Sequence, residues 1–156
     1  SLLEIQYRRK EEKMVIGDVQ NGQDIIIRYK EQDIYYIEVK SKWNFDEPDH
    51  MSVNQMRQAV LNPQNYALCC VELTDYSSAD VEKISIQTIL AHCYVHLDIG
   101  DKLSDLIKAI VNDDSDAETH IKIRDYRCDL NKGFFTSSPH IGIQDLVDDI
   151  LSKVSK

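Results

Sequence analysis

Glycine, proline and positive charge are all scarce in this chain of 156 residues. With 5 glycines and 3 prolines, the chain is neither collagen-like nor of low complexity. Lysine and arginine number 18 against 27 aspartates and glutamates, so the formal net charge is −9. Because phosphate contacts are made mainly by lysine and arginine, this balance argues against a generic basic coat for nucleic acid. Any nucleic-acid function must therefore come from a local site.

Long apolar runs and metal-type cysteine pairs are also missing. No apolar run approaches the roughly 20 residues that a membrane-spanning helix needs, so we predict no membrane partner. The four cysteines form no Cys-x-x-Cys pair and no Cys/His cluster with zinc-finger spacing. With no signal peptide visible, we expect reduced thiols and a cytoplasmic location. The chain begins with Ser1 rather than methionine, so we expect a fragment of a larger protein whose other domains are partners.

The length predicts one α/β domain over residues 1–156, with a core at about 1–75 and an extension of helices and strands at about 76–156. Alternation, apolar runs and turn residues predict the elements of the core. They are a helix tail at 2–13, strands at 14–18, 24–29 and 34–40 with a polar turn at 30–33, a loop at 43–50, a helix from 52 to 61, and a strand at 66–73.

The pattern of the extension is weaker, and we expect fewer elements there. They are a short helix or strand within 86–94, a helix at 103–111, an acidic loop at 112–117, a strand at 120–127 and an amphipathic helix at 143–154.

Three charged residues of the first half stand out as a candidate site. Asp24 opens one predicted strand, and Glu38 and Lys40 lie near the end of the next. Because side chains alternate along a strand, Glu38 and Lys40 point the same way, and we expect Val39 to point into the core. If the two strands form a hairpin, Asp24 and Glu38 come close together.

A pair of carboxylates suits a hard divalent cation, so Asp24 and Glu38 are candidate ligands for Mg²⁺ or Mn²⁺. Such a metal polarises a phosphodiester and lowers the pKa of a bound water. Lys40 is positioned to orient that water and stabilise charge on the phosphate. The helix that begins after Ser52 brings Gln55 toward the same site. An equally simple alternative is a solvated sheet face with a cross-strand ion pair and no ligand.

Four short motifs follow one another in a telling order. They are Gly22-Gln23-Asp24-Ile25, Tyr36-Ile37-Glu38-Val39-Lys40, Ser52-Val53-Asn54-Gln55 and Tyr66-Ala67-Leu68. This order resembles the PD-(D/E)xK nuclease superfamily, and within it the NO VEIN C-terminal-like domain of unknown function. The resemblance implies a restriction-endonuclease-like α/β fold, whose core is a helix, a three-stranded meander, a helix and a further strand.

The resemblance also implies roles for individual residues. Asp24 and Glu38 match the metal-binding acids, Lys40 the catalytic lysine and Gln55 the supporting polar residue of the helix. The family usually adds a glutamate from a first helix, for which Glu4, Glu11 and Glu12 all remain candidates. The implied function is metal-dependent hydrolysis of DNA, of the kind found in restriction or phage defence. The alternative is an inactive nuclease fold used for binding or scaffolding.

Charge is unevenly divided along the chain. Residues 1–60 hold 9 Lys and Arg against 11 Asp and Glu, whereas residues 61–156 hold 9 against 16. The acidity therefore lies mainly outside the motifs and does not exclude a nuclease-like site. The candidates for DNA contacts are Arg8, Arg9, Lys10, Lys13, Lys42 and Arg57.

Overall fold

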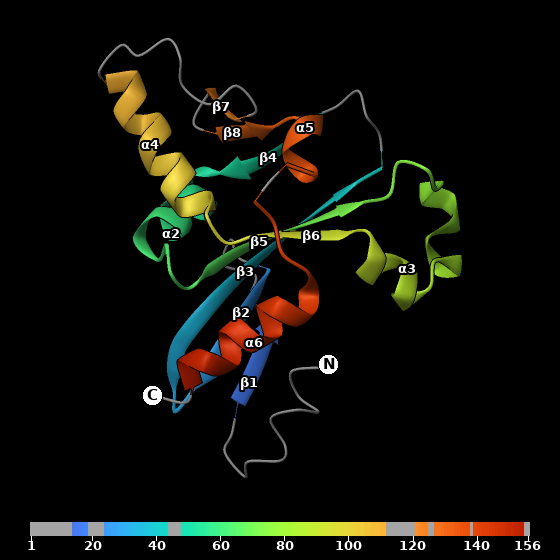
Figure 1. Cartoon of the computed structure of the whole chain (residues 1–156), viewed down its shortest axis with the longest axis horizontal. Helices are drawn as coiled ribbons and strands as arrows, with labels where there is room; N and C mark the ends of the chain where they lie inside the picture. The colour runs from blue at the N-terminus through green and yellow to red at the C-terminus, as the bar shows by residue number, and fades with distance from the viewer. Residues whose placement is uncertain are drawn as a thin grey trace.

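The computed structural model describes residues 14–18, 24–43, 48–111, 121–124, 127–137 and 139–154. These residues form a mixed α/β structure with a five-stranded sheet and a three-stranded sheet (Figure 1). Within the described ranges, no helix is long and apolar enough to span a membrane. The helix predicted at 2–13 and the acidic loop predicted at 112–117 lie outside them.

The five-stranded sheet contains the predicted meander and the further strand. Its order is β1 (Met14–Asp18), β2 (Ile25–Tyr29), β3 (Gln32–Lys42), β5 (Tyr66–Glu72) and β6 (Cys93–His96). Strand β5 runs parallel to β3, whereas the other neighbours are antiparallel. Every residue of β5 except Glu72 is buried, which explains its unbroken apolar sequence. The restriction-endonuclease-like order of meander, helix and further strand is thus confirmed.

The hairpin between β2 and β3 is tighter than the four-residue turn predicted at 30–33. Only Lys30 and Glu31 lie outside the strands, with φ angles of 49° and 64°. Two successive left-handed residues are typical of the two-residue turn whose twist matches that of the flanking strands. Strand β3 therefore starts at Gln32 and is longer than the sequence pattern indicates.

Helix α2 (Val53–Leu61) begins where the sequence predicts, with Ser52 as its N-cap and Gln55 completing a capping box. The loop predicted at 43–50 is wrong at its end, because β4 (Asp49–Ser52) starts there. This strand pairs with β8 (Arg127–Leu130), far away in the sequence. A strand stabilised by so distant a partner has little local signal.

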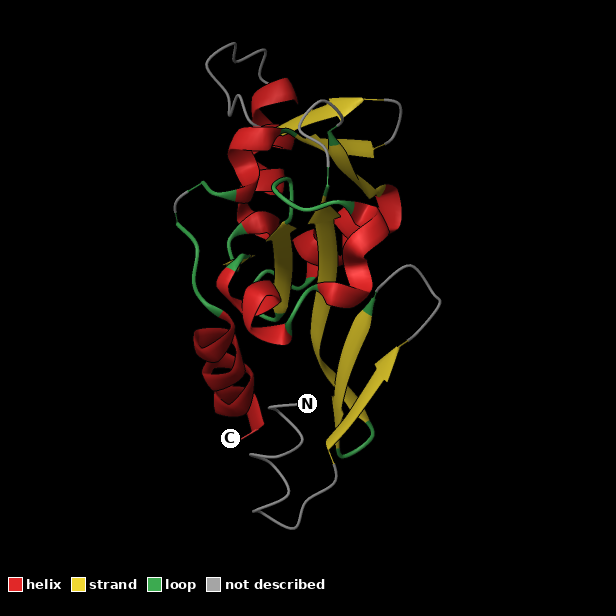
Figure 2. Cartoon of the chain, turned by 90° about the vertical axis from the view of Figure 1, so that its right-hand side faces the viewer, coloured by secondary structure: helices red, strands yellow, loops and turns green. Residues whose placement is uncertain are grey.

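The extension adds helices and strands around the core. Helices α4 (Ile99–Val111) and α6 (Ile143–Val154) confirm the two helices predicted there. The segment at 86–94, for which a short helix or strand was predicted, contains α3 (Ile86–Ala91) and the start of β6. The strand predicted at 120–127 is confirmed over β7 (Ile121–Arg124), but its predicted end is wrong, because Arg127 already belongs to β8. Strands β7 and β8 pair antiparallel, and the order of the small sheet is β4-β8-β7. The sequence analysis also missed the 3₁₀ helix η2 (Ser78–Lys83) and α5 (Lys132–Phe135). Figure 2 shows the small sheet at one end of the molecule and the β2–β3 hairpin at the other.

Two apolar cores lie against the five-stranded sheet, one on each face. On the face that we call the α2 face, Leu68 and Cys70 of β5 pack with α2, α4, α5 and the small sheet. On the opposite face, the α6 face, Ile27, Ile37 and Ala67 pack with helix α6. Alternation along β3 and β5 therefore assigns each side chain to one core or the other.

Glycine is required where α2 meets α4. A Cβ atom on Gly100 would lie 2.3 Å from the carbonyl oxygen of Ala59, which is closer than two such atoms can approach. The bare backbone of Gly100 lets α4 pack directly on α2. This contact fixes the helix that carries Gln55 above the α2 face.

Candidate functional site

Strand β3 carries the candidate site on the α2 face. Glu38 and Lys40 pair in register with Leu68 and Cys70 of β5, so they share the face on which those residues are buried. The side chain of Glu38 is only 1% exposed and that of Lys40 only 17%. A carboxylate removed from water in this way needs strong compensating partners.

One oxygen of Glu38 has two such partners. The ammonium nitrogen of Lys40 donates to Glu38 Oε1 at 2.6 Å, and the amide nitrogen of Gln55 donates to the same oxygen. The other end of the Gln55 amide accepts the backbone N–H of Ser52 at 2.7 Å. The capping box that starts α2 thereby also orients Gln55 toward Glu38. One local sequence signal serves both the helix start and the site.

Asp24 lies immediately before β2 and next to Glu38. Its Oδ2 accepts the backbone N–H of Val39 at 2.7 Å, which continues the ladder past the last pair of β2 and β3, Ile25 with Ile37. Burial raises the pKa of Glu38, and the hydrogen bond and charge of Lys40 oppose that shift. The charge of Asp24 also raises the pKa of Glu38. The two acids are therefore close enough to interact electrostatically.

Val39 is not in the core, contrary to the sequence expectation. Its side chain faces the α6 side of the sheet and is 37% exposed. Strand β2 begins at Ile25, which pairs with Ile37, so β3 has no β2 partner beyond Asp24. At this end of β3, the charged residues Glu38 and Lys40 are therefore less exposed than Val39, the apolar residue between them.

The second oxygen of Glu38 is buried and accepts no hydrogen bond from the described residues. The neighbouring Asp24 cannot supply one while it is ionised, because a carboxylate has no proton to donate. Two neighbouring carboxylates, one of which has a free oxygen, are a donor set that suits Mg²⁺ or Mn²⁺. The residues present therefore fit such an ion.

A third acidic ligand is not part of the described site. Among the residues that the structure describes, no three His, Cys, Asp or Glu side chains gather as a metal-binding group. The candidates Glu4, Glu11 and Glu12 lie outside those residues. The described part of the centre is thus a pair of acids with a lysine and a glutamine.

The structure adds Lys42 and Asp49, which the sequence analysis did not assign to the site. Lys42 is only 2% exposed, lies 3.6 Å from the carboxylate of Asp49, and sits 5.3 Å from the centre of the Phe135 ring. Burial raises the pKa of Asp49, and the charge of Lys42 opposes the shift. Because side chains alternate along a strand, Lys42 lies on the same face of β3 as Glu38 and Lys40. This spacing was the sequence signal that could have assigned Lys42 to the site. Asp49 lacked such a signal, because β4 was predicted as loop.

Burial also removes Lys42 from the candidates for DNA contacts. Arg57 of α2 is exposed and stays a candidate, whereas Arg8, Arg9, Lys10 and Lys13 lie outside the described residues.

Tyr66 is a further polar group on this face, which the sequence analysis named only as part of the Tyr66-Ala67-Leu68 motif and gave no role in the site. Tyr66 pairs with Tyr36 and precedes Leu68, the residue opposite Glu38, by two positions on β5. It is 1% exposed. Its hydroxyl is buried and has no hydrogen-bond partner among the described residues. Burial raises the pKa of Tyr66 most, and the charges of Glu38 and Asp24 raise it further. The phenol is therefore within electrostatic reach of the acidic pair.

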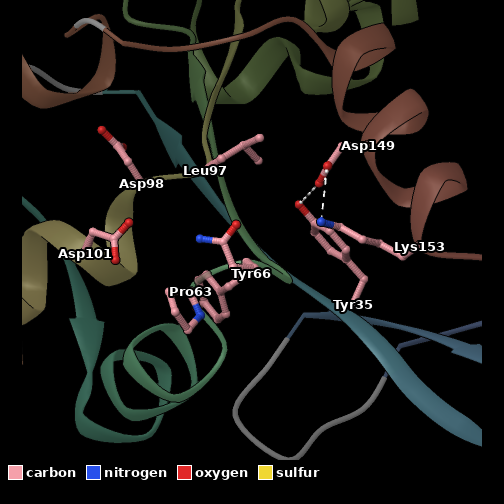
Figure 3. Close-up of a pocket in the computed structure, with 9 residues that line it drawn as sticks. Tyr35, Pro63, Tyr66, Leu97, Asp98, Asp101, Asp149 and Lys153 are labelled. Atoms are coloured by element: carbon pink, nitrogen blue, oxygen red, sulfur yellow. Dashed lines mark hydrogen bonds and ion pairs between the residues drawn. The ribbon is translucent and has the colours of Figure 1, made fainter. Parts of the chain in front are cut away.

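A pocket of about 180 Å³ opens near the start of β5, and Tyr66 is among the residues that line it (Figure 3). Asp98, Asp101 and Asp149 line it, against the single lysine Lys153. In Figure 3, Tyr35 and Lys153 both reach Asp149, at 2.8 Å and 3.5 Å. An acidic lining of this kind repels phosphate, so the pocket is unsuited to a nucleic-acid backbone.

A comparison with known families places the site within a matched segment. The model of the family described as "Protein NO VEIN, C-terminal" matches residues 3–84, which is more than half of the chain. No curated protein and no solved structure matches the chain. The matched segment contains Asp24, Glu38, Lys40 and Gln55.

Proposed function

The chain belongs to the family of NO VEIN C-terminal domains, and from the site within the matched segment we propose that it is a metal-dependent nuclease of the PD-(D/E)xK type. The observation that carries the proposal is the state of Glu38. One of its buried oxygens is held by Lys40 and Gln55, and the other is free beside Asp24. This division leaves an oxygen for a divalent cation without disturbing the partners of the first.

Asp24 and Glu38 would hold Mg²⁺ or Mn²⁺, which when bound supplies a water of lowered pKa and polarises the phosphodiester. Gln55 fixes the orientation of Glu38, because its amide is itself anchored at the start of α2. The ammonium group of Lys40 orients the attacking water and stabilises charge on the phosphate. In the hydrolysis, the water oxygen bonds to phosphorus, one ester bond breaks, and the departing oxygen takes up a proton while the water loses one.

The substrate that we propose is DNA, in a restriction or phage-defence role. The exposed Arg57 of α2, the helix that carries Gln55, is available for phosphate contacts, whereas the acidic pocket of Figure 3 is not. The four cysteines are all free and buried, which supports the cytoplasmic location that we propose.

Cleavage of plasmid DNA in the presence of Mn²⁺ tests this function. We expect the unaltered protein to nick or linearise the plasmid and Lys40→Ala to lose at least about a hundredfold in rate, since the lysine acts on the charge of the transition state. Lys153→Ala is the matched control, because this lysine pairs with Asp149 on α6. If no protein cleaves, or if Lys40→Ala cleaves as fast as the control, the active-nuclease proposal is wrong.

A second candidate function is a nuclease fold kept for binding, without catalysis. It is favoured by the described acids, which form a pair rather than a group of three, and by the burial of Lys42 against Asp49. Calorimetric titration with Mn²⁺ separates the candidates. Saturable binding that Glu38→Gln abolishes, without cleavage by any variant, supports the binding module. A complete lack of binding heat supports neither, and leaves an interaction domain with surface acids.

A further inference from the structure

Two tyrosines on neighbouring strands are equally buried but differ in their partners. Tyr35 and Tyr66 are each 1% exposed. The hydroxyl of Tyr35, on the α6 face, donates to the Asp149 carboxylate at 2.8 Å. The hydroxyl of Tyr66, on the α2 face, has no partner among the described residues. An unpaired buried hydroxyl lowers stability, so the contrast calls for a reason specific to Tyr66.

Tyr66 and Glu38 share both a face and a neighbourhood. The residue opposite Glu38 on β5 is Leu68, and Tyr66 precedes it by two positions on the same face. With strands about 4.8 Å apart and a rise of about 3.3 Å per residue, such diagonal neighbours have Cα atoms about 8 Å apart, within reach of an aromatic side chain. The described residues contain three buried side-chain oxygens without a partner, which are the Tyr66 hydroxyl, Glu38 Oε2 and Asp98 Oδ1. Asp98 lines the acidic pocket together with Tyr66, whereas Glu38 does not.

We infer that Tyr66 is a positioning residue of the metal centre, whose hydroxyl holds a water of the hydrated cation that Asp24 and Glu38 bind. The inference rests on the proposed function, since it needs that cation. Mg²⁺ keeps several of its waters when it binds to proteins, and a water with its hydrogens outward needs acceptors around it. The Tyr66 oxygen is such an acceptor, and its O–H group can in turn donate to a free carboxylate oxygen through one water.

This role explains why a hydroxyl is kept where the fold alone favours phenylalanine. Without a cation, Tyr66 gives the folded state an unpaired polar atom. With the cation and its water, that atom gains a partner, as does the free oxygen of Glu38. Groups that orient metal-bound waters and ligands in this way typically change metal affinity by 10–100-fold when they are removed.

Calorimetric titration with Mn²⁺ and thermal unfolding, applied to the full chain, test the inference. We expect Tyr66→Phe to bind Mn²⁺ about tenfold more weakly. In the absence of metal, its unfolding temperature should be equal to or above that of the unaltered protein, because no hydrogen bond is lost. The matched control is Tyr36→Phe, which removes the hydroxyl of the tyrosine that pairs with Tyr66 on the same face. It should bind Mn²⁺ as the unaltered protein does.

The failures of the inference and of the proposed function are distinguishable. If Tyr66→Phe binds Mn²⁺ normally while Glu38→Gln does not, the role of Tyr66 is wrong and the metal centre stands. If Glu38→Gln binds Mn²⁺ normally, both are wrong. A Tyr66→Phe variant that fails to fold also overturns the inference, because its hydroxyl would then have a structural partner.

Discussion

Apolar cores of similar make-up cover the two faces of the five-stranded sheet, but the two faces differ in the number of polar and charged side chains that they bury. Among the described residues, the buried polar or charged side chains are Glu38, Lys42 and His96, and all three lie on the α2 face. On the α6 face, the buried hydroxyl of Tyr35 is satisfied by Asp149. The α6 face is built as an ordinary core, and the α2 face is built around polar groups.

This difference separates residues kept for stability from residues kept for a site. Burying an ionised group costs several kcal/mol before its partners compensate, and apolar residues of similar volume are often at least as stable in its place. A fold gains little stability by burying two charged groups and a histidine on one face. The α2 face is thus where substitutions should affect metal binding, and the α6 face is where they should affect stability alone.

The largest loss of stability should come from a cavity on the α6 face. Ile150 of α6 is fully buried in that core. Ile150→Ala should lower the free energy of unfolding by about 3 kcal/mol, measured by urea denaturation, because it removes buried methyl groups and leaves a void. The variant, where folded, should bind Mn²⁺ as tightly as the unaltered protein. A weaker Mn²⁺ affinity in this variant would break the division between the faces.

A smaller loss should follow from removing the charge partner of Glu38. Lys40→Met leaves the buried carboxylate with Gln55 alone, and should cost about 2 kcal/mol at pH 7 because an uncompensated buried charge remains. In this variant the pKa of Glu38 rises further above its value in the unfolded chain. The folded state then gains protons as the pH falls toward 5, so the cost should shrink in that range.

The double variant Glu38→Gln/Lys40→Met checks the origin of that cost. It removes both charges and should recover most of the stability lost in Lys40→Met, since replacing both partners of a buried pair is often nearly neutral. Urea denaturation of the single and double variants at pH 7 measures the recovery. A double variant no more stable than Lys40→Met would mean that the lysine stabilises by packing rather than by charge.

The smallest effect should come from His96, the third polar group of the α2 face. Its two ring nitrogens lie 3.2 Å and 3.3 Å from the carbonyl oxygens of Phe135 and Pro139, although a neutral imidazole can donate to only one of them. Burial lowers the pKa of His96 most, and the charge of Lys102 adds to this, whereas the two carbonyls and Asp98 oppose it.

Stability should therefore fall as the pH drops through about 6.5, where the histidine of the unfolded chain takes up a proton and that of the folded chain does not. Urea denaturation between pH 7.5 and 5.5 measures the slope. His96→Gln should flatten it, and the exposed His50→Gln is the control that should not. Equal slopes in His96→Gln and the unaltered protein would show that this imidazole is not held neutral.

Much of the fold could be predicted because its signals are local. The alternation in β2 and β3, the apolar run of β5, the capping box of α2 and the helical periodicity of α4 and α6 each lie within a dozen or so neighbouring residues. The missed strand β4 depends on a distant partner. Among the described strands it pairs with β8, and a short strand without its partner has the sequence pattern of a loop. The predicted strand at 120–127 reads as one continuous pattern, because local alternation does not reveal where a hairpin divides it.

The candidate site shows the same division. Periodicity and capping are local properties, so the sequence alone predicts that Glu38 and Lys40 share a face, that Asp24 stands at the start of the preceding strand, and that Gln55 occupies the first turn of a helix. How the two faces of the sheet are used depends on the tertiary structure. It buried Glu38, exposed Val39 and paired Lys42 with Asp49. It also left Tyr66 without a partner near the acids. Burial and partner choice depend on what packs against the strand, and those helices and strands come from distant parts of the chain.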